Sequence, residues 1–146
     1  MKQNQQLGLN FKLAGNTGLV YPPFLDLLPA DVQDKTDMVA IAQFVWTTEN
    51  PKQKDWIAAY TKMFSKDPDS TSIDAYDGTY LLKKVIESAG SLDAEALKKA
   101  FNSVKYEAVG GTIAFDSTGQ ALRPMVIVRL TPKSGRGFQV IRVIEP

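Results

Sequence analysis

The sequence predicts an α/β fold that ends in antiparallel β-structure. Short apolar runs without helical periodicity alternate with longer segments whose apolar residues recur every three or four positions. Asn50-Pro51 is a helix-start signal and Gly90 is a helix-end signal. Residues 109–120 combine two glycines, a β-type run and Asp-Gly turn chemistry, which is typical of a hairpin.

The front of the chain contains two predicted strands and short helices. Residues 1–6 have the composition of the end of an amphipathic helix that stops at Leu7-Gly8. We expect a strand at residues 11–14, a turn at 15–18 and a short helix at 21–28, whose two prolines fit its first turn. Residues 38–45 have no 3.6-residue rhythm and predict a buried strand.

Three longer helices are predicted in the middle of the chain. The first begins at Pro51 with Asn50 as cap and Gln53 as capping-box partner, and it ends at Asp67-Pro68. The second covers residues 72–89, and the third covers residues 93–103 with Ser91 or Asp93 as cap. The expected inward faces are Trp56, Ile57, Tyr60, Met63 and Phe64 in the first, Tyr76, Tyr80, Leu81, Val85 and Ile86 in the second, and Leu97, Ala100 and Phe101 in the third.

Three strands are predicted at the end of the chain, at residues 112–115, 125–130 and 138–144. The turn at residues 116–119 lies between the first two, so we expect these two strands to pair as a hairpin.

Composition excludes several classes of function. The 146 residues include 17 basic and 16 acidic side chains, so net charge favours neither nucleic acid nor an anionic membrane surface. The chain has no cysteine and no histidine, which excludes disulfides, thiol nucleophiles, Cys/His zinc sites and imidazole triads. The longest apolar runs, residues 40–46 and 125–130, are far shorter than the roughly 20 residues of a membrane-spanning helix. The first six residues lack the apolar region of a signal peptide.

Enzymatic and metal-binding chemistry also lack support. Asp74 and Asp77 lie three residues apart on one predicted helix face, but no nucleophile or phosphate-binding loop accompanies them. The spacing of Asp67, Asp69 and Asp74 does not match a calcium loop. The sequence therefore predicts a protein that is not an enzyme and holds neither cofactor nor metal.

Several short motifs occur in a recognisable order. They are Leu7-Gly8-Leu9 with Leu13-Ala14-Gly15, then Ala75-Tyr76-Asp77 with Leu81-Leu82 and Ile86-Glu87-Ser88-Ala89-Gly90, then Gly111-Thr112-Ile113-Ala114-Phe115-Asp116 with Gly119. Together they resemble the C-terminal part of the type I periplasmic substrate-binding proteins, particularly the branched-chain amino acid receptors of ABC transporters.

This resemblance implies Rossmann-like three-layer lobes with a C-terminal β-hairpin region, of which the chain supplies only a portion. Residues 1–70 would form part of the second lobe (βαβα), residues 71–116 would belong to the first lobe, and residues 117–146 would form a hinge crossing and the last strands. The implied function is that of a periplasmic or extracellular solute-binding component, which acts by cleft closure and is read by an ABC permease. We expect exposed apolar surface, covered by a missing N-terminal segment or by a swapped identical copy.

The resemblance also implies ligand contacts in the turn after the early strand. In the amino acid receptors a carboxylate at this position pairs with the ligand's ammonium group, whereas Asn16 occupies it here. An amide has no counter-charge for an ammonium group, so a small organic or aromatic acid becomes at least as plausible a ligand as an amino acid. Thr17 can donate a hydrogen bond to such an acid. Both residues are also ordinary turn formers.

Five further residues are candidates for ligand contact. Trp46 and Thr47 follow a predicted strand, where ligands and hinges gather in the family, although Trp46 also suits a core position. Thr71 and Asp74 open the long helix near the place of a ligand-contacting aromatic residue, and both also suit helix capping. Tyr76 follows them on the same helix, where core packing is the simpler role.

Two other functions remain open at this stage. The same fold serves as the sensory domain of receptors and regulators. Alternatively, the chain is a non-binding fragment that persists as a domain-swapped oligomer.

Overall fold

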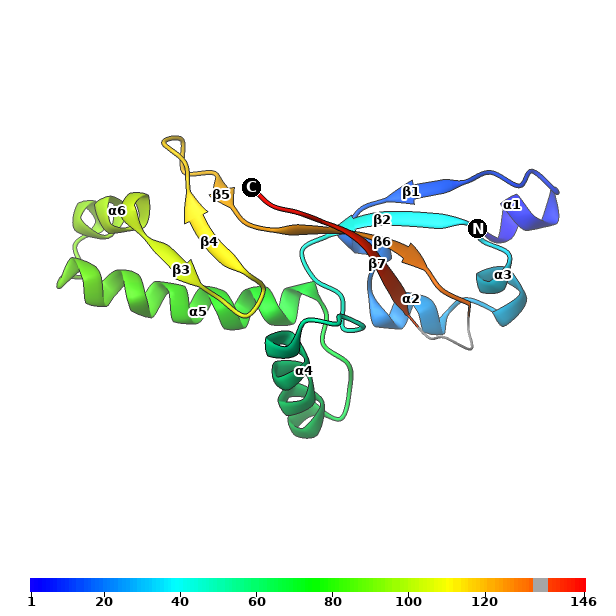
Figure 1. Ribbon diagram of the computed structural model, residues 1–146, viewed down its shortest axis with the longest axis horizontal. Helices are drawn as coiled ribbons and strands as arrows, with labels where there is room; N and C mark the ends of the chain where they lie inside the picture. Colours follow the sequence, from blue (N-terminus) through cyan, green and yellow to red (C-terminus); the bar gives the residue numbers. More distant parts are fainter. Residues whose placement is uncertain (133–136) are drawn as a thin grey trace. The chain divides into compact units, whose positions relative to one another are not determined.

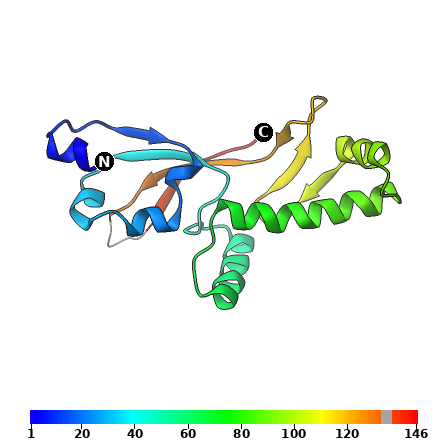
Figure 2. The same cartoon turned by 180° about the vertical axis from the view of Figure 1, so that it is seen from behind.

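The computed structural model describes residues 1–132 and 137–146, and it divides into two compact units. Unit 1 contains Met1–Ser70 and Met125–Ile144, and unit 2 contains Thr71–Pro124 and Glu145–Pro146. The chain therefore passes between the units after residues 70, 124 and 144. Figures 1 and 2 show the elements of each unit from two sides.

Unit 1 contains a four-stranded sheet in the order β1-β2-β6-β7. Its strands are β1 (Leu13–Gly15), β2 (Met38–Ala42), β6 (Met125–Leu130) and β7 (Phe138–Ile144). β1 runs parallel to β2, whereas β2 and β6, and β6 and β7, are antiparallel. The sheet is thus completed by strands that come more than 80 residues after β2 in the sequence.

Short helices support this sheet. They are α1 (Lys2–Gln6), the 3₁₀ helix η1 (Thr17–Leu19), α2 (Pro22–Asp26) and α3 (Ala30–Asp34). In Figures 1 and 2, α2 and α3 lie on the same side of the sheet. Their apolar side chains pack against those of the central strands, in a core that contains Leu25, Leu28, Val32, Met38, Ala40, Ala42, Val128, Leu130 and Phe138.

Unit 2 packs two helices on a small antiparallel sheet. Its elements are α5 (Ser70–Ala89, whose first residue belongs to unit 1), α6 (Ala94–Ser103), β3 (Lys105–Glu107), β4 (Thr112–Phe115) and β5 (Ala121–Leu122). The sheet order is β3-β4-β5, with both pairings antiparallel. The buried core contains Leu81, Val85, Val104, Ala108 and Ile113.

The predicted start signals are confirmed by the structure, as is the stop at Gly90 after α5, whereas α4 ends at Phe64, before the predicted Asp67-Pro68. Helix α4 covers Pro51–Phe64, and the Asn50 side chain accepts hydrogen bonds from the backbone of Lys52 and Gln53. Of the two candidate caps for α6, Asp93 caps the helix by accepting from two backbone N–H groups. The capping-box role of Gln53 is wrong, because the backbone N–H of Asn50 donates to the Thr48 hydroxyl instead, at 3.1 Å.

The predicted hairpin between residues 112–115 and 125–130 is wrong in its second strand. After the turn, β4 pairs with the two-residue β5, which matches Phe115 with Ala121. The strand at residues 125–130 pairs with β2 and β7 in the other unit. An apolar run of this kind fits any buried sheet, so its partner depends on the tertiary fold.

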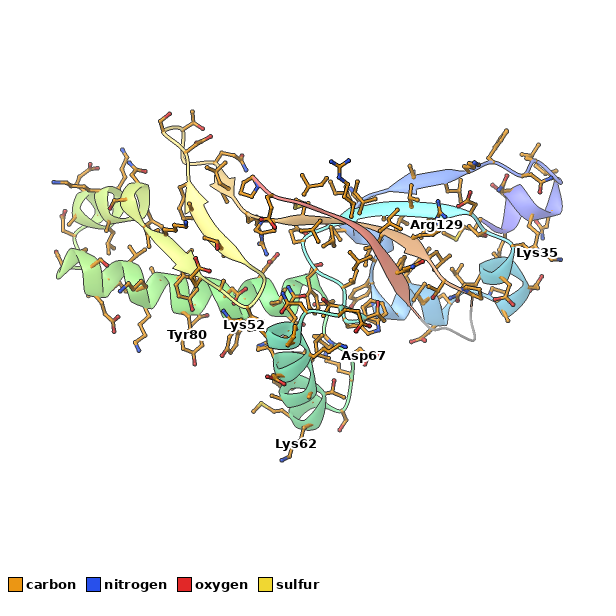
Figure 3. All side chains as sticks on the ribbon, viewed as in Figure 1. Lys35, Lys52, Lys62, Asp67, Tyr80 and Arg129 are labelled. Carbon is orange, nitrogen blue, oxygen red and sulfur yellow. The ribbon has the colours of Figure 1, made fainter. Side chains whose placement is uncertain are left out.

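The predicted inward faces of two helices also need correction. Helix α4 has no buried residue and Met63 is 76% exposed, so its apolar stripe is not a core stripe. In α5, Tyr76 and Tyr80 are 41% and 45% exposed. Figure 3 labels Tyr80 on this helix. Leu81 and Val85 are buried as predicted. The other buried positions on the same face are Ile73 and Asp77, which lie two turns and one turn before Leu81, in place of Tyr76 and Tyr80.

The described residues expose many large apolar side chains, as expected from the resemblance. Examples are Leu27 and Phe64 in unit 1 and Leu92 in unit 2, together with Ile141 and Val143 on the edge strand β7. What covers these side chains in an assembly stays a prediction, as does the assignment of the chain to particular lobes.

Candidate functional site

The turn after β1 and the residue after β2 lie at one edge of the sheet in unit 1. Because β1 and β2 run parallel, their carboxyl ends meet at the same edge, the usual place of ligand sites in parallel sheets. Residues 16–19 follow β1, and Gln43 follows β2. The hydroxyl of Thr17 donates to Oε1 of Gln43 at 2.8 Å, which joins the two loops directly.

In the described structure, residues 16–19 and Gln43 bring amide and hydroxyl groups to this edge and contain no carboxylate. Oδ1 of Asn16 accepts from the backbone N–H of Gly18 at 3.1 Å, and Oε1 of Gln43 accepts from Thr17. Within residues 1–132 and 137–146, the amide nitrogens of both side chains have no hydrogen-bond partner. Each can therefore donate to a ligand, and a carboxylate ligand suits these groups better than an ammonium ligand does.

Trp46 and Thr47 lie near the other end of this sheet. The Thr47 hydroxyl donates to the backbone carbonyl of Phe138, and the Trp46 ring packs edge-to-face on the Phe138 ring at a centroid distance of 6.0 Å. Phe138 pairs with Leu130. The preceding residue, Arg129, pairs with Val39 near the start of β2, so Phe138 lies near that end of β2. These contacts anchor β7, and a role of Trp46 and Thr47 in ligand contact stays a prediction.

Asp74 forms an ion pair within unit 2. Its Oδ1 accepts from Nη1 of Arg123 at 2.7 Å, and the Arg123 side chain is only 17% exposed. Nε and Nη2 of Arg123 are buried and have no hydrogen-bond partner in the described part of the chain. Since Asp74 already neutralises a buried cation, its first role in the structure is to hold the segment before β6.

Asp77 lies one turn after Asp74 and is 1% exposed. Its two carboxylate oxygens accept from the backbone N–H groups of Val109 and Gly110, at 2.9 and 2.8 Å. Asp77 therefore has a structural role, because its carboxylate ties α5 to the loop before β4.

The other two candidates on α5 have exposed side chains. Thr71 lies in the first turn, and the Tyr76 ring packs on that of Tyr80 at a centroid distance of 4.8 Å. Partial burial raises the pKa of the Tyr76 hydroxyl, and a hydrogen bond with Tyr80 adds to this effect. Ligand contact by Thr71, Asp74 or Tyr76 stays a prediction.

Sequence reasoning missed Gln43 and Arg123. Gln43 is the first polar residue after the buried run at 38–42, so its position at a strand's carboxyl end was a usable signal. Arg123 precedes Pro124 and the apolar run of β6, but no local pattern announces its pairing with a residue 49 positions earlier.

Membrane-spanning helices and clusters of metal-binding side chains are both absent from the described residues. None of their helices is long and apolar enough to cross a membrane. No cluster of three or more acidic, histidine or cysteine side chains in this part of the chain has the arrangement of a metal site.

Comparison with known proteins agrees with this architecture. A family described as periplasmic binding protein matches residues 1–136. A solute-binding protein of an ABC transporter from Rhodopseudomonas palustris BisB5, solved with 3,4-dihydroxybenzoic acid, is 21% identical with a TM-score of 0.81. A leucine-binding protein from Thermotoga maritima is 21% identical with a TM-score of 0.79. A leucine-, isoleucine-, valine-, threonine- and alanine-binding protein from Brucella ovis, in a closed conformation, is 17% identical with a TM-score of 0.82.

These likenesses extend over 99% of this chain but over only 41%, 40% and 39% of the three solved proteins, respectively. The chain thus spans about two fifths of their length. At these identities, the likeness to the solved structures establishes the fold.

Proposed function

The chain belongs to the periplasmic binding protein family, and from this premise we propose that it is part of the solute-binding component of an ABC-type transporter. The proposed ligand is a small organic or aromatic acid. An amino acid is the alternative ligand. Membership of this family implies action in the periplasm.

The proposed class of ligand rests on the hydrogen bonding of Asn16 in the turn after β1. Its Asn16 offers an amide in place of a carboxylate, and the oxygen of that amide already accepts from Gly18. The N–H₂ group of that amide has no partner among the described residues, and the oxygen keeps one lone pair, so the side chain offers a ligand more donors than acceptors. An ammonium group placed here would find only that one lone pair, whereas a carboxylate would gain an N–H donor.

The solved structures support both ligand classes. Two solute-binding proteins from Rhodopseudomonas palustris were solved with 3,4-dihydroxybenzoic acid and with benzoate. Others are named for leucine or for branched-chain amino acids. The uncharged turn of this chain makes the aromatic acids the first choice.

In a complete receptor, the proposed mechanism is a shift in population and not bond chemistry. A ligand that contacts both lobes stabilises the closed state by its differential affinity for that state. A membrane permease then distinguishes the closed state from the open one.

Calorimetric titration of the 146-residue chain tests the ligand class. The ligands are benzoate, 3,4-dihydroxybenzoate, leucine and leucinamide, which carries an ammonium group but no carboxylate. We expect the aromatic acids to bind, and leucinamide to give no signal. Binding of leucine without binding of benzoate would refute the aromatic acid class. A folded chain that binds none of the four would refute the receptor function.

The substitution Asn16→Asp tests the role of the turn. The new carboxylate would repel the carboxylate of the ligand, and we expect benzoate affinity to fall at least about tenfold. Asn102→Asp, at an exposed position of α6, is the matched control with the same change in charge. Equal losses in the two variants would show that net charge, and not the turn, governs binding.

A further inference from the structure

Gln43 has a defined orientation at the carboxyl edge of the sheet in unit 1. It is half-buried directly after β2, and its Oε1 accepts from the Thr17 hydroxyl at 2.8 Å. A glutamine amide has one acceptor oxygen and two N–H donors. Oε1 keeps one lone pair after it accepts from Thr17, whereas both N–H groups of Nε2 are without a partner among the described residues.

Asn16, one residue before Thr17, is oriented in the same sense. Its partner is a backbone N–H, which can only donate, so the Asn16 oxygen must face Gly18 and the amide nitrogen must face away. Two neighbouring loops therefore present one amide N–H₂ group each. Each amide oxygen already accepts one hydrogen bond and keeps a single lone pair, so free donors outnumber free acceptors on these two amides.

Such an arrangement discriminates between ligand groups of opposite charge. A carboxylate only accepts hydrogen bonds, and its bonds to amide donors are strengthened by its charge. An ammonium group only donates, so it could bond only to the remaining lone pair of each amide oxygen. The loss of its hydration on binding would then be only partly compensated.

We propose that Gln43 is a specificity-determining residue whose amide N–H donates to the carboxylate of the ligand, and that Thr17 is the positioning residue that orients it. This inference rests on the proposed function, since it names a further contact of the same ligand site. It adds a residue from a second loop to the turn after β1.

The substitution Gln43→Glu tests this role with little change in size. The carboxylate can still accept from Thr17, but the two N–H donors are replaced by a charged oxygen. Hydrogen bonds to charged groups contribute enough that we expect benzoate affinity to fall about 10- to 100-fold at pH 7. Because a protonated carboxyl group can donate, the affinity of this variant relative to the original chain at the same pH should partly recover as the pH falls towards about 4.3, the ordinary pKa of glutamate. The comparison is made at equal pH because benzoate is itself partly protonated there.

Gln139→Glu is the matched control, because Gln139 is exposed on β7, near the other end of the sheet. It should bind benzoate as the original chain does at both pH values. Circular dichroism checks that each variant is folded. If Gln43→Glu does not fold, Gln43→Leu replaces it, with an expected loss of at least about tenfold.

Thr17 is tested by removal and by rescue. Thr17→Val keeps the shape of the side chain but frees the Gln43 amide to rotate, and we expect a smaller loss of about three- to tenfold. Thr17→Ser restores the hydroxyl and should restore the affinity. A loss in both variants would contradict the positioning role.

The outcomes separate this inference from the proposed function. If the original chain binds benzoate and Gln43→Glu binds it equally well, Gln43 has no role and the proposed function stands. If the original chain binds no acid at all, the proposed function itself fails. A loss in Gln43→Glu that matches the loss in Gln139→Glu would also overturn the inference.

Discussion

Replacement of Asp77 by asparagine should destabilise unit 2 without affecting unit 1. The Asp77 side chain is buried and accepts from two consecutive backbone N–H groups, at 2.9 and 2.8 Å. An asparagine of the same shape has one oxygen for one of these donors and places its own N–H₂ group against the other. One buried donor is left unsatisfied, which costs about 1–3 kcal/mol. Asp77→Ala leaves both donors unsatisfied and should cost about 2–6 kcal/mol.

Urea unfolding followed by two signals measures this effect. The two tryptophans, Trp46 and Trp56, both lie in unit 1, so their fluorescence reports that unit alone. Far-ultraviolet circular dichroism also follows α5 and α6, which belong almost entirely to unit 2. For a small unit with an m-value of about 1 kcal/mol/M, a loss of 2 kcal/mol lowers the midpoint by about 2 M.

Asp93→Asn is the control for Asp77→Asn. Asp93 also accepts from two backbone N–H groups, but it is an exposed helix cap at which asparagine serves about equally well. We expect almost no change in its dichroism midpoint. The reasoning is refuted if Asp77→Asn leaves that midpoint unchanged, or if Asp93→Asn lowers it as much.

Four further substitutions have effects of definite sign. Gly111→Ala should destabilise the chain by about 2–4 kcal/mol, because Gly111 has φ +116° and an added Cβ would lie 2.8 Å from a proline ring. Gly78 lies on α5 with open space around it, so Gly78→Ala should stabilise the chain by about 0.5–1 kcal/mol. Thermal unfolding measures both effects. Asn50→Ala should destabilise α4 by about 1 kcal/mol through loss of its cap, which urea unfolding followed by tryptophan fluorescence would detect. Hydrogen bonds lower the pKa of the Asp116 carboxyl; the Thr118 hydroxyl has the largest effect and the backbone N–H groups of the turn add to it. The stability that this carboxylate contributes is therefore present above its ordinary pKa and is lost as the pH falls through the lowered value. Thr118→Val should raise that pKa towards its ordinary value in an NMR titration, and an unchanged pKa would contradict the assignment.

Features that depend on neighbouring residues were predictable from the sequence. The cap of α4 was identified from Asn50-Pro51, and the last strand was expected at residues 138–144, where β7 lies. Such signals act within a few positions, because a cap or turn residue bonds to backbone groups close to it in the chain. The resemblance to the periplasmic binding proteins is confirmed by the family match, since it rests on an ordered series of such local motifs.

Features that depend on distant residues were not predictable. The aromatic stripe of α4 has the periodicity of a core face, yet no residue of that helix is buried, because periodicity shows only that a face is apolar and not what covers it. Likewise, the apolar run of β6 did not show whether it pairs with β4 or with β2.

By itself, the sequence determined most helices, though not α3, most strands, the family and the absence of thiol and imidazole chemistry, because these follow from residue type and spacing. Only the tertiary structure decided that Thr17 and Gln43 meet, 26 residues apart, and that Asp77 is buried under the loop before β4. The physical reason is that an amide or carboxylate acquires its role from the donors around it, and the fold brings those donors from distant parts of the chain.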